Sequence, residues 1–222
     1  MPASYFDVDG TLVSTNLLHP TLYYLMHQRS PMRSLMKLGR AALKAPQLAL
    51  AEMQDRRLFN EMLFTTFEGM SADRLNLLAD DAFESVMRPA VYPHAKDLVS
   101  RARDLGHDVV IVSGALDFLM DRLRDYLGAT HIIANRLELK DNYATGRLLR
   151  PVVAGPEKAR LIRDHAKTHV HDLGECYAYS DSYSDVPMLS IVGHPAAVNP
   201  DGKLERLART YGWPVVSLKK AS

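Results

Sequence analysis

Apolar and polar residues follow two different spacings along this chain, one typical of strands and one typical of helices. A short apolar run over Ala3–Val8 is typical of a buried strand, and two aspartates and a glycine interrupt it. From about Asn16 to Arg88 glycine is rare, and apolar residues recur at helical spacing, as in SADRLNLLADDAFESVM. We therefore expect three or four helices and no strand between residues 16 and 88, with one helix starting at Ser71.

Beyond residue 89 short apolar runs alternate with helical patterns. Strands are predicted at 107–114, 130–135, 175–180, 195–199 and 213–218, and helices at 94–106, 117–128, 155–169, 185–192 and 202–212. Residues 136–149 look like a hairpin that turns at Asp141–Asn142. Alternation of this kind predicts a parallel sheet covered on both faces. The expected fold is α/β, with a doubly wound parallel-sheet core at 1–15 and 89–222 and a helical insertion at 16–88.

The composition excludes several classes of protein. The net charge of the 222 residues is +1, so no global field attracts nucleic acid. Cys176 is the single cysteine, which excludes an internal disulfide and fits a reducing, cytoplasmic setting. We expect neither a secretory signal nor a membrane-spanning helix, because no apolar stretch reaches about 18 residues. The nine histidines are expected to be scattered, without metal-ligand spacing.

Polar residues stand where the predicted strands end. Ligands of open α/β sheets bind beyond the carboxyl ends of the strands, so these are the candidate functional residues. They are Asp7, Asp9, Ser113, Gly114, Asp181 and Asp185, with Lys158 near the start of a helix.

Hydrolysis of a phosphomonoester would use all of these groups. A carboxylate nucleophile divides the reaction into two steps through an aspartyl-phosphate intermediate. Mg²⁺ and a lysine offset the repulsion between the carboxylate and the phosphate, which are both anionic. Asp7 is the expected nucleophile. Asp9, two residues on and on the same side of the chain, is the expected acid/base. Mg²⁺ prefers oxygen ligands, here Asp7, the carbonyl of Asp9, and Asp181 with Asp185, while Ser113, Gly114 and Lys158 would bind phosphate.

Each residue also has a simpler structural interpretation. Asp9–Gly10 alone is a common turn dipeptide, and Ser113 could merely end a strand. Asp185 could cap the helix that begins at Val186. Lys167, late in the same helix, is an alternative to Lys158. The occurrence of all these residues in order favours the catalytic interpretation.

The motifs DVDGT, SG, a following lysine and SDSYSDVPML resemble the four motifs of the haloacid dehalogenase superfamily of phosphatases. The segments SGALDFLMDRL and ANRLELKDNYATG and the place of the helical insertion are similar to its phosphoserine phosphatase-like branch. The resemblance implies an Mg²⁺-dependent phosphatase that is phosphorylated on Asp7 and uses Asp9 as acid/base. It also implies that residues 16–88 form a cap that selects the substrate.

The sequence defines the substrate less closely than the reaction. Phosphoserine phosphatases of this family carry a glutamate shortly after the first motif, whereas this chain has Asn16. An arginine for a substrate carboxylate could be Arg56 or Arg57. Small metabolites such as phosphoserine or histidinol phosphate, and lipid phosphates, are all candidates. The alternatives are phosphoryl transfer to another acceptor and a non-catalytic phosphate-binding or membrane-docking module.

The predicted helix at 31–45 is basic. Arg33, Lys37, Arg40 and Lys44 follow one another at spacings of four, three and four residues, and so share one helical face. A basic amphipathic helix can lie on an anionic membrane, here the inner face of the cell membrane. A solvated face of an ordinary helical bundle is the alternative.

Overall fold

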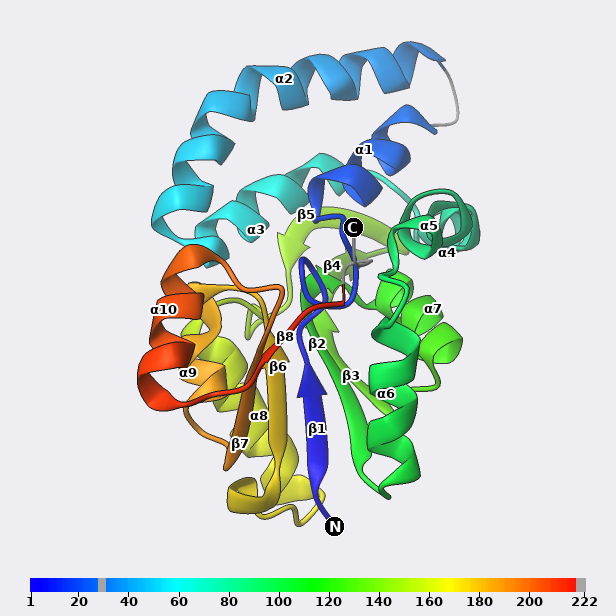
Figure 1. Ribbon diagram of the computed structural model, residues 1–222. Coiled ribbons are helices and arrows are strands. Elements are labelled where there is room, and N and C mark those ends of the chain that lie inside the picture. Colours follow the sequence, from blue (N-terminus) through cyan, green and yellow to red (C-terminus); the bar gives the residue numbers. More distant parts are fainter. Residues whose placement is uncertain (28–30, 219–222) are drawn as a thin grey trace.

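The computed structural model describes residues 1–27 and 31–218, apart from the side chains of Arg33, Arg40, Glu52 and Met53. A parallel sheet of six strands forms its centre (Figure 1). The strand order is β3 (His131–Asn135), β2 (Asp108–Leu116), β1 (Ala3–Phe6), β6 (Tyr177–Ser180), β7 (His194–Val198) and β8 (Val215–Val216). All five strand pairs are parallel, which confirms the predicted α/β core.

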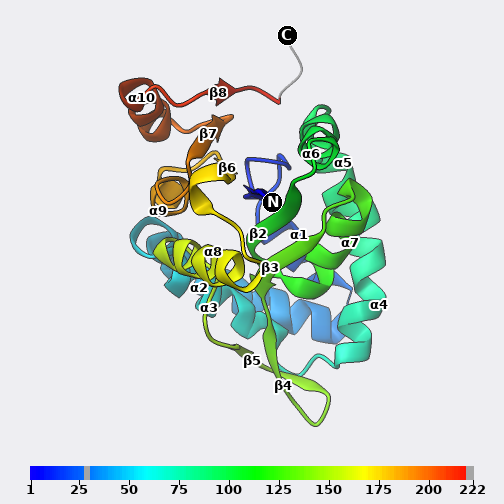
Figure 2. The ribbon, with the colours of Figure 1, turned by 90° about the horizontal axis from the view of Figure 1, so that it is seen from below.

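Helices cover both faces of the sheet (Figure 2). Val109 and Ile111 of β2 pack toward one face and Val110 and Val112 toward the other, because successive strand side chains alternate. The first face is covered by α6 (Ala95–Asp104) and α7 (Asp117–Leu127), and the second by α8 (Pro156–Thr168), α9 (Val186–Leu189) and α10 (Gly202–Tyr211). The buried β-branched run of β2 is therefore shared between two hydrophobic cores.

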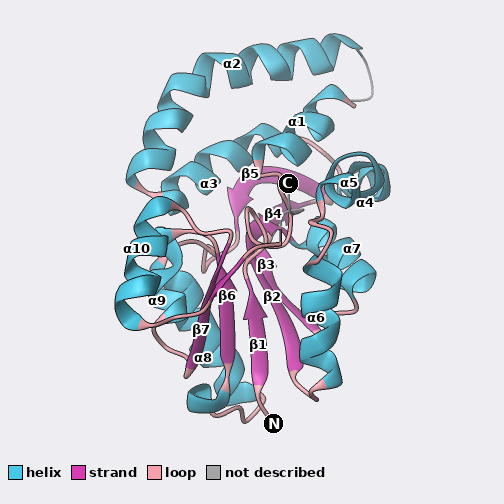
Figure 3. Ribbon diagram, in the orientation of Figure 1, coloured by secondary structure: helices cyan, strands magenta, loops and turns pink. Residues whose placement is uncertain are grey.

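The residues between β1 and α6 stand beyond the carboxyl ends of the strands (Figure 3). As predicted, the described part of this segment is helical and contains no strand. Its elements are α1 (Leu18–Met26), α2 (Pro31–Gln54), α3 (Arg56–Phe64), a 3-10 turn (Thr65–Phe67), α4 (Ala72–Ala82), a π-helical turn (Phe83–Met87) and α5 (Arg88–Ala90). Among the described helices, none combines the length and apolar character that crossing a bilayer requires.

The hairpin of β4 (Leu137–Lys140) and β5 (Tyr143–Leu148) joins this helical segment. Ala144 receives a hydrogen bond from the N–H of Gly69 at 2.8 Å and donates its own to the Met70 carbonyl at 2.8 Å. The predicted turn is confirmed, since Asp141 and Asn142 have φ of +49° and +67°. The hairpin thus ties the helical segment to the sheet domain.

Local sequence signals predicted most ends of the helices and strands correctly. Pairing between residues distant in the sequence determines the other ends. The hydroxyl of Ser71 accepts a hydrogen bond from the N–H of Arg74 at 3.3 Å and caps α4, as its sequence predicted. β2, in contrast, continues past the predicted end at Gly114, because Leu116 pairs with Asn135 across an irregular register. Ser113 and Gly114 therefore lie inside the strand.

The expectation that the histidines are scattered is wrong. His165 and His169 lie one helical turn apart at the end of α8, and His131 and His171 lie beside them. The four-residue spacing is visible in the sequence, but the contribution of β3 depends on the fold.

Candidate active site

The chain folds into a compact loop directly after β1. The N–H of Asp7 still donates to the Tyr179 carbonyl of β6 at 2.9 Å. The carbonyl of Val8 then accepts from the N–H groups of Thr11, Leu12 and Val13 at 3.1, 2.9 and 3.1 Å. This loop presents the side chain of Asp7 at the carboxyl edge of the sheet, where it is buried.

Lys158 joins two of the predicted carboxylates. Its Nζ donates to Asp7 Oδ1 at 2.5 Å and to Asp185 Oδ2 at 2.7 Å, and all three side chains are buried. Burial lowers the pKa of Lys158, but Asp185 and Asp7 outweigh this effect and hold the pKa above its usual range. Lys158 is therefore a buried ammonium, whereas the alternative Lys167 is exposed near the end of the same helix.

Asp185 has a role other than the predicted helix cap. It precedes α9, but its side chain makes no capping hydrogen bond. Its Oδ2 accepts instead from Lys158 Nζ and from Ser180 Oγ at 2.8 Å. Asp185 therefore fixes the position of the ammonium.

Asp181 approaches Asp7 from the end of β6. The hydroxyl of Thr11 lies 3.0 Å from Asp7 Oδ2 and 3.3 Å from Asp181 Oδ1, so it bridges the two carboxyl groups. Burial raises the pKa of Asp181 to about 8, and the charges of Asp7 and Asp185 add to the rise. Burial likewise raises the pKa of Asp9 to about 7, with Asp7 adding to it.

These groups fit a divalent cation. Four aspartates surround one buried lysine, so carboxyl groups outnumber the ammonium, and the charge of Asp7 adds to the rise that burial causes in the pKa of Asp9 and of Asp181. The carboxylates of Asp7 and Asp181 and the hydroxyl of Thr11 supply hard oxygen atoms, which Mg²⁺ prefers.

Two asparagines, Asn135 and Asn60, lie against Gly114. Asn135 Nδ2 donates to the Gly114 carbonyl at 2.7 Å, and Asn135 Oδ1 accepts from the Val153 N–H at 2.8 Å. A Cβ at Gly114 would lie 2.9 Å from Nδ2 of Asn60, which comes from α3. Ser113 is buried, and its hydroxyl accepts from the Ala115 N–H at 3.0 Å. This strand therefore presents backbone at the site.

A cavity of about 40 Å³ brings most of the predicted residues together. Its lining includes Asp7, Asp9, Gly114, Lys158, Asp181 and Asp185. Leu17, Arg56 and Asn60 line it from the helical segment, and Arg56 also lines a neighbouring cleft of about 1100 Å³. Of the two candidate arginines, Arg57 lines that cleft only. Ser113 is not among the lining residues.

Asp9 also borders a second, apolar pocket. This pocket, of about 20 Å³, is lined by Leu17, Tyr24, Phe64, Phe67 and Met87 among others. Asp9 therefore stands between the polar cavity and an apolar space beneath α1.

Sequence reasoning missed Asn60 and the bridging role of Thr11. Asn60 is buried and its Oδ1 has no hydrogen-bond partner, while Nδ2 points to the Val153 carbonyl at 3.4 Å. One signal was present, because Asn60 is a lone amide among the buried residues Phe59, Leu63 and Phe64 of α3.

Known proteins resemble this chain in sequence and in fold. The model of the haloacid dehalogenase-like hydrolase family matches residues 5–190. An "inhibition of morphological differentiation protein" of Streptomyces azureus is 30% identical, over 98% of this chain and 79% of its own length. A probable phosphatase of Mycobacterium tuberculosis is also 30% identical, over 98% and 76%. A phosphoserine phosphatase of the same organism, SerB1, is 30% identical, over 96% and 70%.

Solved structures share the fold. A protein of unknown function from Bordetella pertussis Tohama I superposes with a TM-score of 0.83 at 23% identity, covering 98% of both chains. A substrate-bound phosphoserine phosphatase superposes with a TM-score of 0.69 at 18% identity, covering 97% of this chain and 93% of its own.

The contact between the first loop and Asp181 can be tested with two glycines. Gly10 has φ +79°, and a Cβ there would collide with the Asp181 carboxylate; Gly69 has φ +76° and open space around it. Gly69→Ala should cost about 1–2 kcal/mol of unfolding free energy from the left-handed backbone alone. Gly10→Ala should cost ~1–3 kcal/mol more from overpacking, measured by urea denaturation. Equal losses in the two variants would show that Gly10 and Asp181 are not in close contact.

Proposed function

The chain belongs to the haloacid dehalogenase-like hydrolase family and is a phosphatase of that family, and we propose that it hydrolyses phosphomonoesters through a phosphoryl group on Asp7. The observation that carries the proposal is the buried contact of Lys158 with Asp7 and Asp185, beside Asp181 and Asp9. A lysine in this position neutralises the nucleophile and the phosphate together.

The proposed reaction has two displacements. An oxygen of Asp7 attacks phosphorus, the bond from phosphorus to the substrate oxygen breaks, and Asp9 gives its proton to that oxygen. Asp9 then takes a proton from a water, the water oxygen attacks phosphorus, and the bond to Asp7 breaks to release inorganic phosphate. Lys158 and the backbone of Gly114 hold the phosphoryl oxygens.

We propose Mg²⁺ as the cofactor of this site. Asp7, the carbonyl of Asp9, and Asp181 would hold it, with Asp185 supporting them through Lys158. When bound, the ion neutralises negative charge on the phosphoryl oxygens.

Residues 16–88 are proposed to act as a cap domain over a core of residues 1–15 and 89–222. Leu17, Arg56 and Asn60 support this assignment, because they extend the lining of the cavity from the helical side. Opening of such a cap would admit substrate, and closure would exclude bulk water.

The proposed substrates carry no ammonium group near the phosphate. The four aspartates are the only acids among the described residues that line the cavity, and Arg56 adds positive charge at its edge. Asn16, where a phosphoserine phosphatase has its glutamate, instead accepts from the Leu18 N–H at 3.1 Å. Among the described residues, the helical segment adds no acid to the lining that could balance an ammonium on the leaving group, so neutral or anionic leaving groups fit best. Small metabolites and lipid phosphates both remain within this class.

Removal of the nucleophile tests the reaction. Asp7→Asn should lower Mg²⁺-dependent phosphate release from an aryl phosphate at least ~1000-fold, as loss of a covalent nucleophile does. Asp97→Asn, an exposed acid of α6, is the matched control and should leave the rate unchanged. Full activity in Asp7→Asn would exclude the proposed reaction.

A pair of substrates tests the leaving group. Phosphoserine and the O-phosphate of 3-hydroxypropionate differ by the amine alone. We expect kcat/KM at least ~10-fold higher for the compound without the amine, because an unpaired buried ammonium is costly. A preference for phosphoserine would overturn the substrate assignment and leave the role of Asp7 intact.

A second proposal concerns the outer face of α2, which forms the most distant layer above the sheet (Figure 1). We propose that this face lies on an anionic membrane surface. Its exposed apolar residues share one side of the helix: Met32, Leu35, Met36, Leu43 and Leu50. No acid occurs between Pro31 and Ala51, so no negative charge in this stretch opposes an anionic surface.

The lysines of α2 face inward, which changes the predicted orientation. Lys37 Nζ donates to the carbonyls of Thr66 and Glu68 at 2.7 and 2.8 Å, and Lys44 Nζ donates to Thr65 Oγ1 at 3.0 Å. The side chains of Arg33 and Arg40, also named in the prediction, lie outside the described residues. The membrane contact is therefore assigned to the apolar side of α2.

Sedimentation with liposomes tests this contact. The protein should sediment with phosphatidylglycerol vesicles, and Leu35→Gln with Leu43→Gln should reduce the bound fraction at least ~10-fold through lost apolar burial. Leu77→Gln, at an exposed leucine of α4, is the control. If the wild type stays in the supernatant, or forms dimers that the α2 variants abolish, the membrane assignment is wrong.

A further inference from the structure

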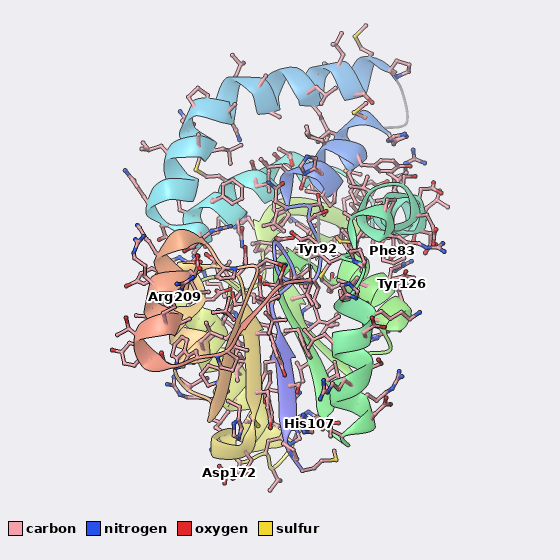
Figure 4. The ribbon with its side chains drawn as sticks, in the orientation of Figure 1. Phe83, Tyr92, His107, Tyr126, Asp172 and Arg209 are labelled. Atoms are coloured by element: carbon pink, nitrogen blue, oxygen red, sulfur yellow. The ribbon has the colours of Figure 1, made fainter. Side chains whose placement is uncertain are left out.

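Four histidines gather at the end of the sheet opposite the Asp7 cavity. His131 begins β3, His165 lies in the last turn of α8, and His169 follows that helix directly. The ring centroids of His165 and His169 are 4.3 Å apart, and the ring of His131 lies 5.2 and 4.6 Å from them. Figure 4 labels His107 and Asp172 at this end of the molecule, next in the chain to Asp108 and His171.

The donor atoms of these side chains converge. One ligand atom from each of His131, His165 and His169 lies within 4.8 Å of the other two, and the same holds for Asp108, His169 and His171. His169 belongs to both groups. Five possible ligands from β2, β3 and the end of α8 therefore share one small region.

His171 has a nitrogen that lacks a hydrogen-bond partner. Its Nδ1 lies 2.7 Å from the carbonyl oxygen of Met1, and a carbonyl only accepts, so Nδ1 carries the hydrogen. Its Nε2 lies 3.1 Å from Asp108 Oδ2, but the two atoms form no hydrogen bond. The side chain is 2% exposed. A cation between Nε2 and Oδ2 would have one ligand atom from each residue.

His165 repeats this arrangement. Its Nε2 is buried without a partner, while Nδ1 lies 3.2 Å from the hydroxyl of Tyr5. Metal-binding histidines are commonly held in this way, with the second nitrogen fixed by an outer partner.

We propose that His131, His165 and His169 bind one zinc-type divalent metal ion, with Asp108 and His171 beside it as further ligands. Imidazole nitrogens suit Zn²⁺, whereas Mg²⁺ prefers the oxygen donors of the Asp7 cavity, so the two ends of the sheet select different ions. The ion would join the start of β3 to the end of α8. Its role is structural, because the site lies at the amino ends of the strands.

Calorimetric titration with zinc chloride tests the site. The whole chain, freed of metal by a chelator and then given excess Mg²⁺ to fill the Asp7 cavity, should bind one Zn²⁺. His169→Gln should weaken this binding at least ~100-fold, because loss of an outer partner alone costs 10–100-fold. His169 is exposed, so this variant should fold normally.

Two controls test whether Zn²⁺ binding is specific to the histidine cluster. His94→Gln, an exposed histidine before α6, should bind Zn²⁺ as the wild type does. Zn²⁺ should also raise the Tm of the wild type and leave that of His169→Gln unchanged, because binding to the folded state alone stabilises it. The proposal is overturned if the wild type binds no Zn²⁺ in the presence of Mg²⁺, or if His165→Gln and His169→Gln both bind it with unchanged affinity.

Discussion

The buried ammonium of Lys158 is the interaction on which the rest of the site depends. It touches Asp7 after β1 and Asp185 before α9, and so connects two carboxylates that lie far apart in the sequence. Burial of such charges is costly unless each has partners. The lysine satisfies that need only because β1 and β6 are neighbours in the sheet and α8 begins at the carboxyl edge. Four aspartates around one lysine still leave negative charge, which a divalent cation would neutralise.

The same helix connects the two ends of the molecule. Lys158 lies in the first turn of α8, and His165 and His169 lie at its other end. Eleven residues separate Lys158 from His169, which is about 16 Å along a helix. A metal ion held by the histidines would therefore anchor the helix that places the Lys158 ammonium beside Asp7.

Local patterns predicted the parts of the fold that depend on neighbouring residues. The hairpin turn at Asp141–Asn142 and the cap of α4 at Ser71 are short-range features, and both are confirmed. Polar residues also follow the ends of the predicted strands, and a lysine lies near the start of a predicted helix. This pattern grouped five residues before the fold was known: Asp7, Asp9, Lys158, Asp181 and Asp185. The structure brings them into one cavity.

Features that depend on distant pairing were not predicted. The continuation of β2 to Leu116 requires Asn135 of the next strand, and the place of Asn60 beside Gly114 requires α3 to approach the sheet. The histidine cluster joins β3 to the end of α8 in the same way. In the sequence each of these residues has an ordinary local role, and only the fold gives it another.

Detection of a phosphorylated intermediate tests the central claim most directly. The protein would be mixed with substrate and Mg²⁺, quenched in acid within a single turnover, and digested for mass spectrometry. The account predicts one phosphoryl group on the peptide that contains Asp7, labile in base and absent from Asp7→Asn. Full turnover with no phosphorylated peptide, or a phosphoryl group on any other residue, would contradict it.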